Sequence, residues 1–311
     1  MICTSTTTLP LTEAYQAFLD EVTQAGLLVP LGVRGVYGYN GVFDSVLQSF
    51  DRLVTRRAAH FQADIMRLPG VLSREHYLKT SHIENFPDLM GSVHSFMGRD
   101  REHIAMLTKR QNGEEWTQDL APSGLMLSPA CCYPLYPTLT GTLPDEGATV
   151  DLLSQVFRHE PSIDPCRMQI FRQREFVRVG TADQALEHRR QCLELGRDTL
   201  AEVGLEVDVV LANDPFFGRG GRVMAASQKD QDLKHEFTFA VASDQKPTAI
   251  ASTNCHVDYF GKAFDIKLPN GEPAHSACIG FGLERITLAL FKHHGFDPDL
   301  WPYEVKNALE L

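Results

Sequence analysis

Apolar residues recur at helical spacing near the start of the chain. Between residues 12 and 25 they stand three or four positions apart, and Gly26 follows where a helix commonly ends. A second amphipathic stripe runs over residues 42–54. Residues 61–68 then alternate between apolar and polar until Pro69 stops the pattern, which predicts a strand. The first part of the chain is therefore expected to form two helices and a strand.

The later half of the chain alternates between strand and helix patterns. Strands are predicted over residues 167–179 and 207–212, with a helix between them over 182–203. Residues 234–242 and 248–257 predict two adjacent strands, and a last helix is expected to begin at the glycines of 280–293. Long strands grouped late, with flanking helices, favour an α+β domain on an antiparallel sheet over a series of βαβ units.

Composition and charge exclude several classes of protein. Of the 311 residues, 43% are hydrophobic and 22% are charged, which excludes disordered and collagen-like chains. The 29 Lys and Arg residues stand against 40 Asp and Glu, and the net charge of -11 disfavours nonspecific binding of nucleic acid. No apolar run reaches the roughly 20 residues of a membrane span, and the Thr-rich start does not resemble a secretory signal. A cytoplasmic location without a membrane partner is expected.

The seven cysteines are scattered and odd in number, which in a reducing compartment indicates free thiols or metal ligands. If the neighbours Cys131 and Cys132 lie on one strand, their side chains face opposite ways and only one can reach a given site. Cys278, taken alone, is a small buried apolar residue. Four cysteines are expected to be free thiols without a role: Cys3, Cys166, Cys192 and Cys255.

Two short segments could carry chemistry. Residues 157–160 read Phe-Arg-His-Glu, where Arg158 could bind a phosphate through its planar fork and Glu160 could accept from an amino group or hold a cation. Residues 280–285 read Gly-Phe-Gly-Leu-Glu-Arg, so a ligand can approach the backbone closely with Arg285 about one turn away. Taken alone, the first could be a surface ion pair and the second an ordinary helix start. Their joint presence favours a nucleotide site.

Together these segments resemble the signatures of the class II aminoacyl-tRNA synthetases. Residues 157–160 resemble the second signature, residues 280–285 resemble the third, and the early helix, strand and Pro69 resemble the first, which builds a dimer interface. Within this superfamily the chain is similar to the amino acid:[carrier protein] ligases, homologues of the catalytic core of the atypical seryl-tRNA synthetase. The stretches that carry this similarity are residues 33–37, 132–134, 157–162, 212–218 and 275–285.

The resemblance implies one catalytic domain over residues 1–311, with an antiparallel sheet flanked by helices and no room for an appended tRNA-binding region. It also implies a homodimer. ATP would bind bent over the sheet, and attack by an amino acid carboxylate would give an aminoacyl-adenylate. Arg158 and Arg285 would be the catalytic residues, because arginines can stabilise the charge that builds at the α-phosphorus.

Further nucleotide contacts follow from the same resemblance. Glu160 would contact the adenine amino group and Phe171 the adenine face. Glu236 and Ser252 would lie where the superfamily holds Mg²⁺ and phosphate. The remaining nucleotide-binding residues of this set are Arg167, Met168, Lys234 and Ala249.

The family also carries a zinc ion held by two cysteines and a glutamate, which this sequence can supply as Cys132, Glu175 and Cys278. Three protein ligands leave one position open, which would take the α-amino group of the substrate. Because Cys131 stands beside Cys132, either of the two could be the first cysteine ligand. Cys132 is preferred because it directly precedes a Tyr-Pro pair, as the ligand does in the family pattern.

The expected reaction is activation of glycine or alanine and transfer to the phosphopantetheine thiol of a carrier protein, without tRNA. Carrier proteins are usually acidic, so a local basic patch is expected, for which residues 172–190 supply arginines; the same segment could be a solvated helix face. Alternatives are a minimal class II synthetase, an amide ligase on the same fold, or a non-catalytic regulator that binds amino acid or uncharged RNA. The retained phosphate-binding residues argue against the regulator.

Overall fold

A seven-stranded sheet forms the centre of the computed structural model, which describes residues 9–214, 216–217, 226, 228–229 and 232–311. The strand order is β10 (Asp208–Leu211), β11 (Lys234–Phe239), β12 (Thr248–Val257), β14 (His275–Gly282), β9 (Ile170–Gly180), β8 (Ala148–Phe157) and β3 (Asp64–Met66). Neighbouring strands are antiparallel, except that β3 runs parallel to β8. The expected α+β fold with an antiparallel sheet is confirmed.

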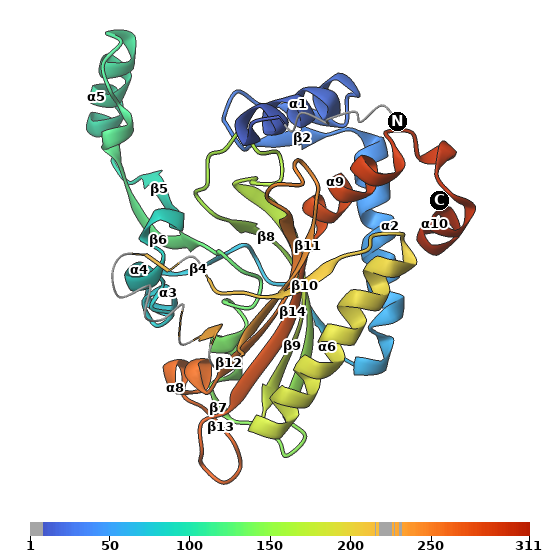
Figure 1. The fold of residues 1–311 in the computed structure, drawn as a ribbon. Coiled ribbons are helices and arrows are strands. Elements are labelled where there is room, and N and C mark those ends of the chain that lie inside the picture. The colour runs from blue at the N-terminus through green and yellow to red at the C-terminus, as the bar shows by residue number, and fades with distance from the viewer. Residues whose placement is uncertain (1–8, 215, 218–225, 227, 230–231) are drawn as a thin grey trace.

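Helices cover one face of this sheet (Figure 1). Both α6 (Ala182–Glu202) and α9 (Leu283–His294) pack against β9, β12 and β14. The amphipathic α2 (Gly41–Arg57) packs on α9, and α10 (Tyr303–Leu309) packs on α2 and α6. Phe50 of α2 reaches the sheet, where its ring centroid lies 6.2 Å from that of Phe281. The apolar stripe seen in the sequence is therefore the surface that attaches α2 to the core.

Side-chain caps explain where two of these helices begin. The Asn40 side chain accepts a hydrogen bond from the Phe43 backbone at the start of α2. Thr181 and Gln184 form a reciprocal capping box at the start of α6. Before α2, the chain forms α1 (Leu11–Gln24) and the hairpin of β1 (Leu28–Pro30) and β2 (Tyr37–Tyr39).

A smaller unit lies between β3 and β8. Its three-stranded sheet has the order β4 (Val71–Ser73), β6 (Leu120–Leu127) and β5 (Ser92–Phe96). Its helices are α3 (Arg74–Leu78), α4 (His82–Asn85) and α5 (Asp100–Gln111). Figure 1 shows α5 projecting away from the rest of the molecule, consistent with the absence of any buried residue in this helix.

Short elements complete the described chain. Helix α8 (Tyr259–Phe264) follows β12, and the short strands β7 (Gly141–Thr142) and β13 (Ile266–Lys267) pair in parallel. The 3-10 helices are η1 (Ala59–Phe61), η2 (Pro87–Leu89), η3 (Thr117–Asp119), η4 (Tyr136–Leu139) and η5 (Pro298–Leu300). None of the helices in the described ranges is both long enough and apolar enough to cross a lipid bilayer.

Most predicted elements are confirmed, and some boundaries are corrected. The helices predicted over residues 12–25, 42–54 and 182–203 are α1, α2 and α6, and four predicted strands are β9, β10, β11 and β12. The strand predicted over 61–68 is formed only as β3. The helix predicted over 280–293 is wrong at its start: Gly280 to Gly282 pair with neighbouring strands as the end of β14, so α9 begins at Leu283.

The cysteines are free thiols wherever the structure describes them, and all six of these are buried. Cys131 and Cys132 lie in a turn after β6, so the alternation expected of a strand does not apply to them. Cys3 lies outside the described residues.

Candidate active site

Alternate residues of four neighbouring strands line a pocket on the face of the sheet opposite α6. Gly196 of α6 packs close to Phe237 and Ile279, which identifies the helix-covered face. The strand residues that line the pocket on the other face include Lys234 and Glu236 of β11, Ser252, Asn254 and His256 of β12, Cys278, Gly280 and Gly282 of β14, and Phe171, Gln173 and Glu175 of β9. The empty space of this pocket, its open mouth included, is about 990 Å³.

Strand register brings four of these residues into one row. Glu236 pairs with Ser252, Ser252 with Gly280, and Gly280 with Glu175. A Cβ atom on Gly280 would lie 2.9 Å from the side-chain nitrogen of Gln173, so a larger residue would push this flexible side chain aside and fill part of the floor. Glycine therefore keeps the floor of the pocket open between Ser252 and Glu175.

Two arginines lie against the ring of Phe171 at one end of the pocket. The guanidinium carbon of Arg158 is 5.6 Å from the ring centroid, and that of Arg285 is 5.3 Å away. Arg158 Nε donates to the Pro129 carbonyl at 3.0 Å, which fixes its stem. Both residues were predicted to contact a nucleotide, and the structure brings them together although they are far apart in the sequence.

Arg285 is buried in a way that leaves one donor unused. Its Nε donates to the Cys166 carbonyl at 2.8 Å and its Nη1 to the Ala249 carbonyl at 3.1 Å. Its Nη2 is buried and has no partner among the described residues. Burial, reinforced by the nearby charges of Arg167 and Arg158, lowers the pKa of Arg285 to about 10. An anion at this position would relieve both the repulsion and the unsatisfied donor.

A buried lysine bridges two carboxylates on the opposite wall. Lys234 Nζ lies 2.6 Å from Asp214 Oδ1 and 3.0 Å from Glu236 Oε1. Burial opposes the charge of Lys234, but Asp214 and Glu236 outweigh it and raise its pKa. Burial likewise opposes the charge of Asp214, yet Lys234 lowers the pKa of that carboxyl. Lys234 and Asp214 are therefore held as a charged pair on this wall of the pocket.

The other predicted nucleotide residues lie near this end, with one exception. Glu160 and Arg167 form an ion pair of 3.8 Å, and both line an adjoining pocket that shares Arg158 and Arg285 with the first. Ala249 also lines it. Met168 instead lies in the core, where its sulfur is 3.5 Å from the hydroxyl of Tyr39, and it contributes no surface to the pocket lining.

Cys132, Glu175 and Cys278 line the other end of the same pocket. Burial raises the pKa of Glu175 to about 7, although the Cys132 thiol and Arg158 oppose the shift. Burial also raises the pKa values of the Cys132 and Cys278 thiols. Glu175 Oε2 is buried without a hydrogen-bond partner in the described structure. The site thus has the donor types expected for zinc and an unsatisfied oxygen among them.

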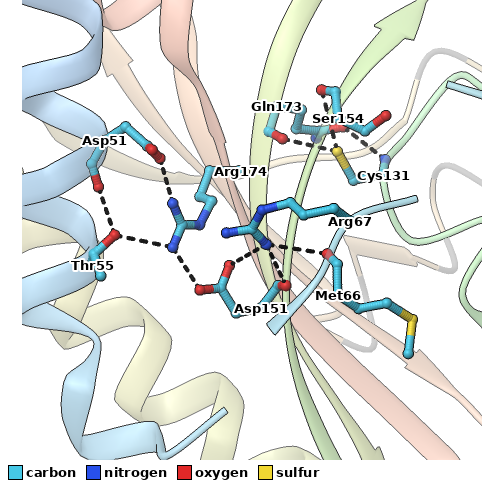
Figure 2. Close-up of polar contacts among 9 residues, drawn as sticks. All are labelled: Asp51, Thr55, Met66, Arg67, Cys131, Asp151, Ser154, Gln173 and Arg174. Carbon is cyan, nitrogen blue, oxygen red and sulfur yellow. Dashed lines mark hydrogen bonds and ion pairs between the residues drawn. The ribbon is translucent and has the colours of Figure 1, made fainter. Parts of the chain in front are cut away.

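Cys131 points elsewhere. Its thiol lies 2.9 Å from the Gln173 carbonyl and 3.6 Å from the Ser154 carbonyl. Figure 2 shows these contacts. Cys132, in contrast, contacts Glu175. However, within the part of the chain that the structure describes, no three His, Cys, Asp or Glu side chains are grouped closely enough to hold a metal ion. The proposed ligands share a pocket but are not assembled into a coordination site.

Sequence reasoning missed several pocket residues. Gln173, Asn254 and His256 alternate with residues on β9 and β12 that were predicted, so the period of two along a strand was a usable signal. Asp214 follows β10 in a loop, where no periodicity marks it. Tyr133 lies in a turn and likewise gave no signal beyond its neighbour Cys132.

Four of the five arginines expected to form a basic patch over residues 172–190 pair with acidic side chains, and the fifth, Arg178, donates to the Thr149 hydroxyl and to the Glu146 carbonyl. Arg172 and Arg174 lie on the helix-covered side of β9 and pair with acidic residues. Arg189 pairs with Asp232. Arg190 is exposed but is held by Glu187 and Glu194 of the same helix. Strand alternation turned the first two arginines inward, which explains why the prediction is wrong.

Comparison with solved structures defines the class of protein. The fold matches the seryl-tRNA synthetase of M. kandleri, solved with A. aeolicus tRNASec, with a TM-score of 0.80 and 21% identity over 94% of this chain and 60% of that one. It matches the prolyl-tRNA synthetase of Giardia lamblia with a TM-score of 0.68 and 13% identity over 91% of this chain and 53% of that one. The chain thus has the class II aminoacyl-tRNA synthetase fold and spans little more than half of each of these proteins.

Sequence relatives define the family. The chain is 38% identical to "Amino acid--[acyl-carrier-protein] ligase 2" of Bradyrhizobium diazoefficiens, over 94% of this chain and 88% of the relative. It is also 38% identical to "Amino acid--[acyl-carrier-protein] ligase 1" of the same organism, over 90% of this chain and 86% of the relative. A type-2 serine--tRNA ligase of Methanococcus aeolicus is 23% identical over 93% of this chain and 58% of the relative. No protein-family model matches the chain. The chain belongs to the family of amino acid--[acyl-carrier-protein] ligases.

Proposed function

We propose that this protein activates a small amino acid with ATP and transfers it to the phosphopantetheine thiol of a carrier protein. The observation that carries the proposal is a single pocket with two different ends. Arg158 and Arg285 flank Phe171 at one end, which suits a nucleotide, and the other end holds two thiols and a carboxylate. Membership of the ligase family supports a carrier protein as acceptor.

At the nucleotide end, the base of ATP would lie against Phe171, with Glu160 at its amino group. In the first step, a carboxylate oxygen of the amino acid attacks the α-phosphorus and pyrophosphate leaves. Arg158 and the unpartnered Nη2 of Arg285 would stabilise the charge that develops on the phosphate oxygens. In the second step, the carrier thiol attacks the carbonyl carbon of the adenylate, which forms a thioester and releases AMP.

Mg²⁺ would be held by Glu236, with Ser252 beside it in the strand register. Glu236 is engaged by Lys234 in the present structure. Arg167 and Lys234 would provide fixed positive charge on this wall. A bound metal ion would add further positive charge, which would offset the negative charge of the adjacent phosphates.

At the amino acid end, Cys132, Glu175 and Cys278 would hold zinc and leave a fourth position for the substrate amino group. The unpartnered Glu175 Oε2 and the contact between Cys132 and Glu175 support this ligand set. Zinc would act as a Lewis acid that keeps the amino group unprotonated. Tyr133 and Phe260 also line this pocket, and their bulk supports a preference for glycine or alanine.

The proposed unit is one catalytic domain that works as a homodimer. The main apolar core cluster includes residues from α1, at Phe18, through α10, at Leu309, which supports one domain; a small second cluster lies in the unit between β3 and β8. Strand β3 forms an edge of the large sheet, and its Ile65 is 70% exposed, which supports burial of this edge against a second copy.

A class II tRNA synthetase is the second candidate, because the fold matches a seryl-tRNA synthetase over 94% of this chain. The test is to offer labelled glycine and alanine, with ATP and zinc, to a panel of phosphopantetheinylated acyl-carrier proteins and, in parallel, to bulk tRNA. Label on the carrier alone is the expected result. Label on tRNA alone would replace the ligase proposal with a synthetase, and no label with no pyrophosphate exchange into ATP would indicate a binding-only regulator.

A further inference from the structure

A buried carboxylate ties the segment that resembles the third signature to strand β9, behind the nucleotide end of the pocket. Glu284, at the first turn of α9, is only 1% exposed. One of its oxygens accepts from the Arg172 backbone at 2.7 Å, and the other accepts from Arg172 Nε at 2.8 Å. Arg172 Nη1 also donates to Asp44 of α2 at 2.7 Å. One arginine therefore links β9 to both α9 and α2.

The residues next to this ion pair in the sequence both line the pocket. Phe171 directly precedes Arg172, and Arg285 directly follows Glu284. The side chains of Phe171 and Arg285 are the pair that approach to 5.3 Å on the pocket side. Because Glu284 holds the amide between residues 171 and 172, it fixes the backbone that presents the Phe171 ring relative to the start of α9.

The surroundings of Arg172 restrict its movement further. Its guanidinium lies 5.5 Å from the ring centroid of Tyr39, which in turn stacks on Phe43 with centroids 4.8 Å apart. Burying a carboxylate with an arginine adds little stability compared with an apolar pair of similar size. A two-oxygen contact to both the backbone and the side chain of one residue does, however, define a unique geometry. This arrangement is better explained by positioning than by stability.

We propose that Glu284 is a positioning residue for ATP: through Arg172 it holds the Phe171 ring, against which the nucleotide base would lie, in a fixed position relative to Arg285, whose unpartnered Nη2 would meet the phosphates. Glu284 does not touch the ligand. The inference rests on the proposed function, since it requires that a nucleotide binds against Phe171.

The same strand offers a matched control. Arg174, two residues along β9, is 2% exposed and donates to Asp51 of α2 at 2.5 Å and to Asp151 of β8 at 2.6 Å (Figure 2). This ion pair also joins β9 to α2 and is as buried as the first. Its strand neighbours, Gln173 and Glu175, lie beyond Phe171 toward the amino acid end of the pocket. Weakening it should therefore destabilise the fold without changing the nucleotide end.

The experiment compares ATP binding by the full chain, measured by calorimetry, in the wild type, Glu284→Gln and Asp51→Asn, with the thermal midpoint of each. Glu284→Gln is expected to raise the ATP dissociation constant about tenfold, the usual scale for loss of one charge-assisted hydrogen bond. The KM for ATP in pyrophosphate exchange should rise with it, and the KM for the amino acid should not. Asp51→Asn should lower the thermal midpoint and leave ATP binding unchanged.

Arg172→Lys is the second variant, for the case in which Glu284→Gln does not fold. Lysine keeps the positive charge but cannot hydrogen-bond Glu284 and Asp44 in the same way as arginine. Arg172→Lys should therefore weaken ATP binding to a similar extent. Wild-type affinity for ATP in either folded variant would overturn the inference, as would an equal loss in Asp51→Asn, which would show general destabilisation. A wild-type protein that binds no ATP would instead overturn the proposed function itself.

Discussion

A buried histidine behind the active-site strand should make the fold sensitive to acid by a measurable amount. His188 of α6 is 4% exposed, its Nε2 lies 3.2 Å from the Phe176 carbonyl of β9, and its ring centroid is 4.7 Å from that of Phe61. Burial lowers the pKa of His188 to about 4; the Phe176 carbonyl opposes this shift, and the charges of Arg178 and His60 reinforce it. The neutral ring is therefore part of the contact between α6 and β9.

The direction of the pH dependence follows from this shift. The folded pKa lies below the ordinary value of 6.5, so the stability contributed by neutral His188 is complete above pH 6.5 and is lost as the pH falls toward 4. At pH 5 the unfolded chain has a protonated His188 and the folded chain does not. This difference lowers the free energy of unfolding by about 2 kcal/mol relative to pH 7.

Glutamine at position 188 tests this value, because it keeps a donor for the Phe176 carbonyl but cannot be protonated. In urea titrations followed by circular dichroism, His188→Gln should lose about 2 kcal/mol less than the wild type between pH 7 and pH 5. Burial also lowers the pKa values of His82 and His256 to about 4, but these residues titrate in both proteins and cancel. Equal losses in the two proteins would refute the assignment of a depressed pKa to His188.

Four further predictions concern the site and the assembly. Arg285→Ala should raise the ATP requirement of pyrophosphate exchange about tenfold or more; an unchanged ATP response would remove Arg285 from the site. Arg174→Met leaves Asp51 without its arginine and Asp151 with Arg67 alone at 3.4 Å, and it should lower the free energy of unfolding in urea by about 3 kcal/mol; an unaltered midpoint would contradict this. Cys278→Ser should lose zinc by elemental mass spectrometry whereas Cys131→Ser retains it, and the reverse pattern would reassign the ligands. Light scattering should give twice the chain mass of 34.7 kDa, and a monomer would exclude the dimer.

The parts of the fold that could be predicted from sequence are those in which burial imposes a period. Helices α2 and α6 bury one stripe each, and the spacing of their apolar residues reveals it. Strand β9 was also predicted, but its two faces were not told apart, because both are polar in places. Gln173 faces the pocket while Arg174 faces α2, and only the position of the helices distinguishes them.

Other features depend on contacts distant in sequence. The boundary at Gly280 to Gly282 was misplaced because glycines indicate a helix start as readily as a strand, and here pairing with β12 and β9 decides the outcome. The unit of β4, β5 and β6 has few buried residues and therefore little apolar pattern to read. The nucleotide residues were found through their resemblance to a family, since no local period marks Arg158.

The order of the strands has a consequence for how the protein is made. β14 lies between β12 and β9, although it is the last of the seven strands to leave the ribosome. Until it does, β8 with β9 and β11 with β12 can form two separate ribbons, each with an unpaired edge open to foreign strands. The nascent chain is therefore most exposed to aggregation until β14 (His275–Gly282) has left the ribosome. Insertion of this one strand closes both edges and, because it carries Gly280 and Cys278, completes the pocket in a single late step.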